Sequence, residues 1–231
     1  MAFWLQLRRD LIRRVARAFY RLLGRVLVEG LHNIPRGTAY VVAINHTSIF
    51  DSPLMLSFWP ESIAAIGAAD VFEKPVQGQI LSWYGTTPVH RGSYDRNLID
   101  EMLFTLRSGT PLLIAPEGGR SHQPAMRRAK PGIALVVDET GVPVVPVGIW
   151  GATDDFLARG LRLQRPGIGM RIGKPFHLPK VEGRGEARRE SRQRNADLVM
   201  RRIAELLPEE YHGVYAGTTP ATSSAAAQGL P

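Results

Sequence analysis

The sequence predicts an α/β fold, in which a single domain has a mixed or mostly parallel sheet flanked by helices and is preceded by an N-terminal amphipathic helix. Two observations lead to this prediction. Short apolar runs of strand length alternate along the chain with longer segments of helical spacing, which is the order that builds a layered α/β domain. The chain has 231 residues, enough to bury one full core with little room for a second domain.

The first predicted element is an amphipathic helix from Phe3 to Val26. On a helical projection its apolar side chains gather on one side, and its arginines, apart from Arg8, gather on the other. This pattern is typical of a helix that lies on a membrane surface, where each arginine near an anionic leaflet contributes roughly 1 kcal/mol. The alternative is a surface helix packed on the domain, with its arginines in water. Arginines interrupt any signal-peptide core, and no uncharged apolar run reaches the ~18 residues of a membrane span.

The remaining elements follow from apolar runs and their stop signals. A buried strand is expected at Tyr40–Ile44 and a short helix at Asp51–Phe58, with further strands at 63–68, 111–115, 142–147 and 170–172. Helices are expected at 76–84, from Ser93 to about Arg107, at 133–139 and at about 186–207, each ended by glycine or proline: Gly85, Gly109, Gly141 and Pro208. The prolines within 142–147 favour an edge or irregular position for that strand.

Composition narrows the classes of partner. The formal net charge is +8 and the calculated pI is about 10.3, which indicates an anionic partner such as nucleic acid, an anionic membrane surface or a phosphorylated substrate. The chain has no cysteine, which excludes a disulfide framework, a cysteine zinc site and a thiol nucleophile. Because the sequence has no helix-turn-helix, zinc-finger or RNA-binding signature, nucleic acid is not the expected partner.

A histidine and an aspartate directly after the first buried strand are the leading catalytic candidates. His46 and Asp51 do not share a helix face at this spacing, so we expect His46 on the loop and Asp51 in the following helix. Histidine can act as a base near neutral pH, and an aspartate can hold its tautomer and stabilise the imidazolium. Without a G-x-S-x-G elbow, and with Ser48 too close to complete a triad, the pair suggests direct activation of a substrate hydroxyl. A structural, hydrogen-bonded histidine is the alternative.

Three later segments of the chain follow the His46–Asp51 pair and carry further motifs. They are Pro88–Gly92 (PVHRG), Leu112–Ser121 (LLIAPEGGRS) and Val142–Val147 (VPVVPV). Together with Asn45–Asp51 (NHTSIFD) they resemble the four signature blocks of the glycerolipid acyltransferase family, over about residues 33–179. One departure is Gly119, where the family usually has threonine; the lost hydroxyl leaves the identity of the acceptor open.

The resemblance implies roles for particular residues. His46 and Asp51 would be catalytic, and the acceptor substrate would be bound by Arg91, Glu117, Gly118 and Arg120. The arginines would hold a phosphate in a fork, while Glu117 would orient them or a glycerol hydroxyl. The donor's phosphates would be held by Arg127, Arg128 and Lys130, for which a solvated charge run is the alternative. The acyl chain would lie along residues 54–59 and 80–84, which are equally suited to the core.

The resemblance also implies a reaction, transfer of an acyl group from acyl-CoA or acyl-carrier protein to a lysophospholipid, with 1-acyl-glycerol 3-phosphate as the leading acceptor. It implies no metal and no redox cofactor. Other lysolipid or glycolipid acceptors, thioester hydrolysis and a non-catalytic membrane-surface protein stay open, as does the oligomeric state. We expect three parts, namely a membrane-associating helix at 1–30, an acyltransferase domain at 31–212 and a disordered tail at 213–231. We expect a peripheral location on the cytoplasmic face of the cell membrane.

Overall fold

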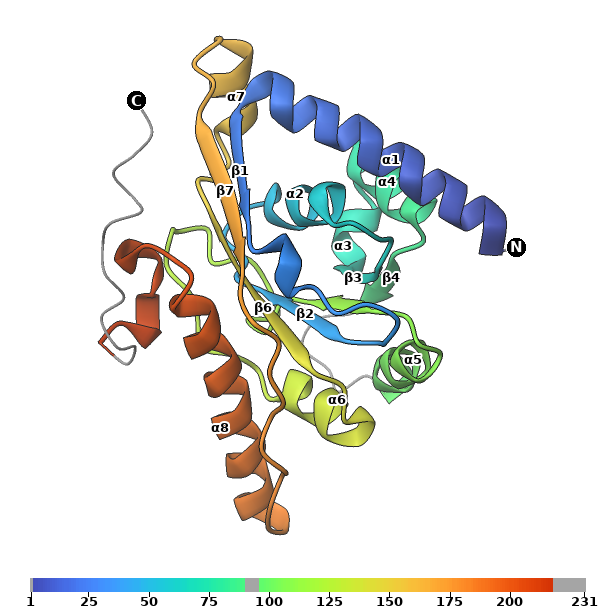
Figure 1. The fold of residues 1–231 in the computed structure, drawn as a ribbon, viewed down its shortest axis with the longest axis vertical. Coiled ribbons are helices and arrows are strands. Elements are labelled where there is room, and N and C mark those ends of the chain that lie inside the picture. Colours follow the sequence, from blue (N-terminus) through green and yellow to red (C-terminus); the bar gives the residue numbers. More distant parts are fainter. Residues whose placement is uncertain (1, 90–95, 218–231) are drawn as a thin grey trace.

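The computed structural model describes residues 2–89 and 96–217, and within them seven strands form one sheet in the order β1-β7-β6-β2-β5-β3-β4 (Figure 1). Their bounds are β1 Arg25–Glu29, β2 Val41–Ile44, β3 Ala64–Ala68, β4 Thr87–Val89, β5 Leu112–Ile114, β6 Val144–Trp150 and β7 Gly167–Ile172. The strands from β6 to β4 are parallel, whereas β7 runs antiparallel to β6 and β1 runs parallel to β7. The predicted mixed, mostly parallel sheet is confirmed.

Helices cover both faces of this sheet. The described helices are α1 Ala2–Leu23, α2 Asp51–Phe58, α3 Ala69–Phe72, α4 Pro75–Tyr84, α5 Arg96–Arg107, α6 Gly132–Thr140, α7 Phe156–Leu161 and α8 Gly185–Ala204, with short 3-10 turns at Leu31–Asn33, Glu209–Tyr211 and Gly213–Tyr215. One core lies between the sheet and α1, α2, α4 and α7, and a second lies between the sheet and α5, α6 and α8 (Figure 1). The result is a three-layer α/β/α domain.

The central strand β2 shows why the sheet is buried on both faces. Val42 and Ile44 belong to the first core, while Val41 and Ala43 belong to the second, because successive side chains of a strand point to opposite faces. All four residues are fully buried. A strand of this kind reads as a continuous apolar run, which is the pattern that predicted it.

Of the two positions predicted for the proline-containing strand, edge or irregular, the structure shows the irregular one. β6 lies inside the sheet between β2 and β7. Pro146 has no N–H to donate, and its side of the strand faces β7, because Val144, two residues earlier, donates its N–H to Phe176 on that side. The pairing shifts by one residue between the Val147–Ile172 pair and the Val144–Phe176 bridge, so the missing donor falls where the ladder is irregular.

Several short elements were not expected from the sequence. β1 begins at Arg25, within the predicted N-terminal helix, and β4, α3 and α7 were also missed. β1 pairs with β7, so the sheet extends into the part of the chain assigned to residues 1–30. At the other end, Gly213–Tyr215 form a turn that buries Tyr215, whereas 218–231 of the predicted tail lie outside the described residues.

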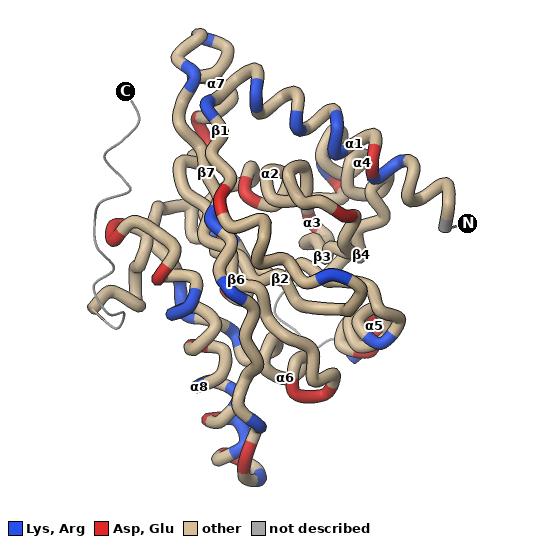
Figure 2. The backbone as a smooth tube through the Cα atoms, in the orientation of Figure 1, with Lys and Arg blue, Asp and Glu red and all other residues tan. Residues whose placement is uncertain are grey.

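The long helix α1 packs on the domain with an arginine-bearing side inward. Arg9 and Arg13 are buried, and Arg17 is half-buried. The prediction that these arginines face water or lipid head groups is therefore wrong for these three. Basic positions recur along α1 from Arg8 onward, and the helix runs across α2 and α4 (Figure 2). None of the helices in the described ranges has the length and apolar character needed to cross a bilayer.

The buried arginines of α1 bind the carboxyl ends of two other helices. The Nε of Arg9 donates to the Tyr84 carbonyl at the end of α4 at 2.7 Å. Arg13 donates to the carbonyls of Leu56 and Trp59 at the end of α2, and Arg17 donates to that of Ser57. The last carbonyls of a helix have no partner within the helix and carry partial negative charge. The arginines supply the missing donors, which explains why an arginine-rich side faces inward.

Candidate active site

The candidate catalytic pair lies at the carboxyl end of β2. His46 is in the loop that follows the strand, and Asp51 is the first residue of α2. The chain bend brings the His46 Nδ1 to 3.2 Å from the Asp51 Oδ2. The His46 side chain is 17% exposed and that of Asp51 is fully buried. Among the described residues the other ring nitrogen, Nε2, has no hydrogen-bond partner, so it is open to a substrate.

Asp51 is held by the loop that it follows. Its Oδ2 accepts the N–H of Thr47 at 2.6 Å and that of Ser48 at 2.7 Å, in addition to the contact with His46. Its Oδ1 is buried without a partner among the described residues. Burial raises the pKa of Asp51, whereas His46 and the two N–H groups act in the opposite direction. Because Oδ2 accepts every contact, a proton bound by Asp51 would sit on Oδ1.

Glu117 braces the backbone next to the catalytic candidates. It is fully buried, its Oε1 accepts the N–H of His46 at 2.8 Å and its Oε2 accepts the N–H of Arg127 at 2.8 Å. Each oxygen therefore has a main-chain donor, and the described residues show no hydrogen bond from an arginine side chain to Glu117. The predicted contact with a glycerol hydroxyl stays a prediction. Burial raises the pKa of Glu117, and the two N–H groups oppose this shift.

The turn after β5 holds His46 from a second direction. Ser121 donates its N–H to the His46 carbonyl at 2.9 Å, so the glutamate and the serine of one turn bind both backbone groups of the histidine. Gly118 adopts φ +68°, and a Cβ there would come within 2.7 Å of the Lys130 side chain. Its N–H donates to the Ala115 carbonyl, so it is engaged in the turn and is not a donor for an oxyanion. Gly118 therefore shapes the turn.

Arg120 is the predicted phosphate-binding residue whose position the structure describes. Its side chain is 21% exposed, and its Nη1 lies 3.8 Å from the Asp154 Oδ1. Asp154 also accepts a hydrogen bond from the Ser48 Oγ at 2.9 Å. Arg120 thus lies beside the His46–Asp51 loop with a carboxylate next to it. The other predicted arginine, Arg91, lies outside the described residues.

Three residues that sequence reasoning did not assign to the site also shape it. The Asn45 side chain donates to the Ile149 carbonyl and accepts the Ile149 N–H, both at 2.8 Å, and so ties the histidine loop to β6. Ser48 and Asp154 connect the same loop to the segment before α7. An asparagine directly after a buried strand was a usable signal, because its amide can continue a strand ladder. Nothing in the local sequence marked Asp154.

The apolar segments considered for an acyl groove divide between the core and the surface, and their contact with an acyl chain stays a prediction. Leu54, Met55 and Trp59 are fully buried in the first core, and Ile80 is exposed on α4. An open hollow of about 100 Å³ does lie beside the site. Its walls include Thr47 and Asp154 together with residues of neighbouring loops, namely His122, Gln123, Pro124, Ala152, Thr153 and Tyr211.

Known proteins resemble this chain in sequence and in fold. The family profile described as Acyltransferase matches residues 25–150. A chloroplastic 1-acyl-sn-glycerol-3-phosphate acyltransferase of Arabidopsis thaliana is 30% identical over 164 residues, 68% of this chain and 45% of that protein. The lyso-ornithine lipid O-acyltransferase of Pseudomonas aeruginosa is 34% identical over 106 residues, 46% of this chain and 40% of that protein. The chain spans about half the length of the curated relatives it matches.

A solved structure has the same architecture. The crystal structure of the 1-acyl-sn-glycerophosphate acyltransferase from Thermotoga maritima superposes with a TM-score of 0.59 at 24% identity, over 83% of this chain and 78% of that one. This likeness shows the fold. The profile match covers more than half of the sequence and includes the His46–Asp51 pair, the Glu117–Arg120 turn and β6. The chain therefore belongs to the acyltransferase family.

Proposed function

We propose that the chain transfers a fatty acyl group from a thioester donor to the free hydroxyl of a lysolipid. The observation that carries the proposal is the His46–Asp51 contact at 3.2 Å, with the second ring nitrogen of His46 open. A carboxylate accepts hydrogen bonds, so the Nδ1 of His46 bears the proton and the Nε2 keeps its lone pair. The pair is thus arranged as a base with an orienting partner.

The reaction proceeds by direct attack of the acceptor on the thioester. The Nε2 of His46 removes the hydroxyl proton while the hydroxyl oxygen bonds to the carbonyl carbon. The carbon–sulfur bond then breaks, the ester is complete, and the thiolate takes the proton back from His46. Asp51 stabilises the imidazolium that forms between these steps. Base catalysis of this kind contributes about 10²–10⁴-fold, and positioning of the two substrates adds to it.

The leading acceptor is 1-acyl-glycerol 3-phosphate, with phosphatidic acid as the product. Arg120 supports it, since a guanidinium beside the catalytic loop can bind phosphate oxygens in a fork. The names of the plant relatives support it too, because they are 1-acyl-sn-glycerol-3-phosphate acyltransferases. A second candidate is a lysolipid with a different head group. It is favoured by the Asp154 carboxylate beside Arg120 and by the Pseudomonas relative, a lyso-ornithine lipid O-acyltransferase.

Two donors fit the same chemistry, acyl-CoA and acyl-carrier protein. Both are anionic, and the exposed side chains of Arg127, Arg128 and Lys130 lie on the segment that follows the Glu117 turn. The Nη1 of Arg127 donates to the Arg120 carbonyl at 3.0 Å, and an Nη of Arg128 lies 3.4 Å from Asp197. These contacts leave the choice of carrier to experiment.

The test is an acyl-transfer assay with labelled long-chain acyl-CoA and acyl-carrier protein in mixed micelles. Lysophosphatidic acid is offered beside a panel of other lysolipids, including lyso-ornithine lipid. The variants are His46→Ala and, as a matched control, His32→Ala, which removes an exposed histidine. We expect phosphatidic acid from the native protein and from His32→Ala, and a loss of about 10²–10⁴-fold in His46→Ala.

Other outcomes identify the alternatives. Product from a different lysolipid would keep the mechanism and change the acceptor. Free fatty acid without acylated lipid would indicate thioester hydrolysis. Unchanged transfer by His46→Ala would overturn the catalytic role of the histidine, and no product with either donor would favour a non-catalytic protein of this fold.

A further inference from the structure

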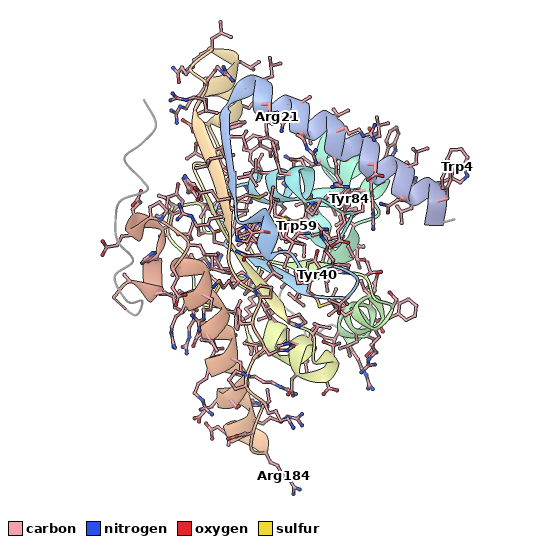
Figure 3. The ribbon with its side chains drawn as sticks, in the orientation of Figure 1. Trp4, Arg21, Tyr40, Trp59, Tyr84 and Arg184 are labelled. Carbon is pink, nitrogen blue, oxygen red and sulfur yellow. The ribbon has the colours of Figure 1, made fainter. Side chains whose placement is uncertain are left out.

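The hollow beside the histidine loop has no role in the proton transfer of the proposed reaction. Its volume is about 100 Å³, and Asp154 is one of its walls, so we call it the Asp154 hollow. Pockets that take whole drug-sized ligands have about 300–1,000 Å³, so this one has room for a small group. The first core, in contrast, is filled by large side chains, of which Tyr40, Trp59 and Tyr84 are at most 3% exposed (Figure 3). The Asp154 hollow therefore suits the head group of a lysolipid and not its acyl chain.

The walls of the Asp154 hollow are held together by Tyr211, which follows α8 and is 8% exposed. The Tyr211 hydroxyl accepts the N–H of Gly151 at 2.8 Å, at the start of the segment that carries Asp154. The Tyr211 carbonyl accepts the N–H of Met126 at 2.9 Å, at the end of the segment that carries His122. One residue from the C-terminal part of the chain thus fixes the positions of two walls.

The charge of the Asp154 hollow is negative. Of the described residues that line it, only Asp154 carries a fixed charge. The Asp154 Oδ1 accepts the Ser48 hydroxyl at 2.9 Å and lies 3.8 Å from the Arg120 Nη1. Its Oδ2 has no hydrogen-bond partner within the described parts of the chain. A carboxylate oxygen that is free in this way attracts a cation and repels a phosphate, so the hollow favours a cationic group.

Other walls of the Asp154 hollow supply uncharged hydrogen-bond acceptors. Thr47 is 8% exposed, and its hydroxyl has no partner among the residues that the structure describes. His122 and Gln123 are exposed, and a neutral imidazole and an amide oxygen both accept hydrogen bonds. A primary ammonium group has three N–H donors, which a carboxylate and these acceptors can satisfy. A trimethylated ammonium group has no N–H to donate.

Arg120 and Asp154 together match a head group that carries both charges. The guanidinium of Arg120 can bind phosphate oxygens, and the free oxygen of Asp154 can bind an ammonium group next to them. Ser48 joins this pair to the candidate catalytic residues, because its hydroxyl binds Asp154 while its N–H donates to the Asp51 Oδ2 at 2.7 Å. An acceptor held by Arg120 and Asp154 is therefore held beside the His46 loop.

The Asp154 hollow is built largely from residues beyond the match to the acyltransferase family. The family profile ends at residue 150. Three walls come from 152–154, and a fourth wall, Tyr211, follows about sixty residues later. The shape and charge of the hollow are therefore properties of this chain that the family motifs do not specify.

We propose that the Asp154 hollow binds the head group of the acceptor, and that Asp154 is a specificity-determining residue that favours a lysolipid with a primary ammonium group beyond its phosphate. The inference rests on the proposed acyl transfer and adds this class of acceptor to lysophosphatidic acid. With lysophosphatidic acid, the Asp154 carboxylate competes with the phosphate for Arg120. With the ammonium-bearing lipid, the same carboxylate contacts the substrate directly.

The test compares acyl transfer to three lysolipids that share a phosphodiester and differ in the group beyond it. Lysophosphatidylethanolamine carries a primary ammonium, lysophosphatidylglycerol carries hydroxyls and lysophosphatidylcholine carries a trimethylated ammonium. The test variant is Asp154→Asn, which keeps the size of the side chain and an oxygen for Ser48. The matched control is Asp155→Asn, which removes the same charge from the adjacent residue, outside the walls of the hollow. Circular dichroism and thermal melting show whether each variant folds.

We expect the native protein to have a kcat/KM about tenfold higher for lysophosphatidylethanolamine than for the other two lipids, since a hydrogen bond to a charged group is gained. Asp154→Asn should lower this preference by at least about fivefold, and Asp155→Asn should keep it. Equal kcat/KM values for the three lipids in the native protein would overturn the proposal. So would a preference for the glycerol or choline lipid, or a preference for the ethanolamine lipid that Asp154→Asn leaves unchanged.

Two further measurements separate this proposal from the reaction on which it rests. Transfer to lysophosphatidic acid without any preference for the ammonium group would leave the reaction standing and overturn the role of the Asp154 hollow. If no acceptor is acylated, the proposed reaction fails, and binding decides the role of the hollow. Short-chain lysophosphatidylethanolamine and lysophosphatidylglycerol are then titrated below their micelle concentrations in a calorimeter. Tighter binding of the ethanolamine lipid, lost in Asp154→Asn, would support the proposal, and equal binding of the two lipids would overturn it.

Discussion

The candidate active site and the underside of α1 use the same physical device with opposite charge. At the site, Asp51 and Glu117 are buried carboxylates that accept backbone N–H groups. Under α1, Arg9 and Arg13 are buried guanidinium groups that donate to backbone carbonyls. In both places a charged side chain satisfies main-chain groups that regular secondary structure leaves unpaired.

The two regions differ in what the buried charge does for the protein. The carboxylates hold a loop whose histidine stays open to a substrate, so changes there should affect the reaction first. The arginines hold an entire helix at a fixed roll, so changes there should affect stability and the exposed surface first. Buried charge is thus a sign of function in one region and of architecture in the other, and variants can separate the two.

The largest effect is expected for Asp51→Asn. An asparagine oxygen in the place of Oδ2 can still accept the contacts of His46, Thr47 and Ser48, but the negative charge that stabilises the imidazolium is lost. We expect kcat/KM for acyl transfer to fall by about 10²–10⁴-fold, with a smaller loss in the free energy of unfolding, because the amide NH₂ takes the unpartnered position of Oδ1. Steady-state kinetics and urea unfolding measure the two effects. Asp70→Asn, an exposed aspartate in the first turn of α3, is the control.

The next effect is expected for Arg13→Ala. Loss of the guanidinium leaves the Leu56 and Trp59 carbonyls without their donor and breaks the ion pair with Asp10. We expect a loss of about 2–4 kcal/mol in the free energy of unfolding. The control is Arg14→Ala, which removes the neighbouring, exposed arginine. A loss of the same size in both variants would contradict the capping role of Arg13.

A smaller effect is expected for Glu117→Gln. The amide can accept one of the two main-chain N–H groups, but its own NH₂ faces the other, so the N–H of His46 or Arg127 loses its acceptor. We expect about 1–3 kcal/mol less stability, with kcat reduced more than KM because the histidine loop loses a brace. Glu139→Gln, at an exposed position, should leave both unchanged. A change confined to KM would return Glu117 to a substrate-binding role.

The pH dependence of stability gives a weaker signal with a defined sign. Burial raises the pKa of Asp51 in the folded state, so the folded protein keeps a proton that the unfolded chain releases near pH 3.9. The stability that the bound proton of Asp51 contributes to the folded protein is fully present below the unfolded pKa. It is lost as the pH rises through the folded pKa. Relative to the native protein, Asp51→Asn should therefore gain stability as the pH rises above the unfolded pKa of about 3.9. Urea unfolding across this range checks the sign; the opposite slope would mean that folding stabilises the carboxylate.

The smallest effect is expected for Asp154→Asn. Its carboxylate is half-exposed and 3.8 Å from Arg120, and exposed ion pairs contribute about 0–1 kcal/mol. Removing the charge should lower the KM for a phosphate-bearing acceptor by up to about fivefold, because the phosphate no longer competes with it for Arg120. Asp155→Asn, the adjacent exposed aspartate, controls for a general change in charge. A higher KM would indicate that Asp154 itself contacts the acceptor.

The sequence alone determined the elements whose signals are local. α2 has the predicted bounds, and α4 ends at Gly85, which adopts a left-handed conformation as helix-ending glycines often do. The position of the candidate catalytic pair was also local, because His46 and Asp51 are joined by a single loop. β1 and β4 were not predicted. Both are edge strands, and the formation of an edge strand depends more on the neighbouring strand than on its own residues.

Only the tertiary structure decided where buried charges and long-range partners lie. The amphipathic pattern of α1 was visible, but whether its arginines face water or the carbonyls of α2 and α4 depends on helix ends contributed by distant parts of the chain. Glu117 was predicted as a substrate ligand, and only the fold shows that each of its oxygens accepts a main-chain N–H from a distant segment. Pro146 lies inside the sheet because an irregular stretch of the neighbouring strand takes up its missing donor. Sequence periodicity shows which face of a helix or strand is apolar and which is polar. Which segment packs against each face is decided by the whole fold, because every buried polar group needs a hydrogen-bond partner.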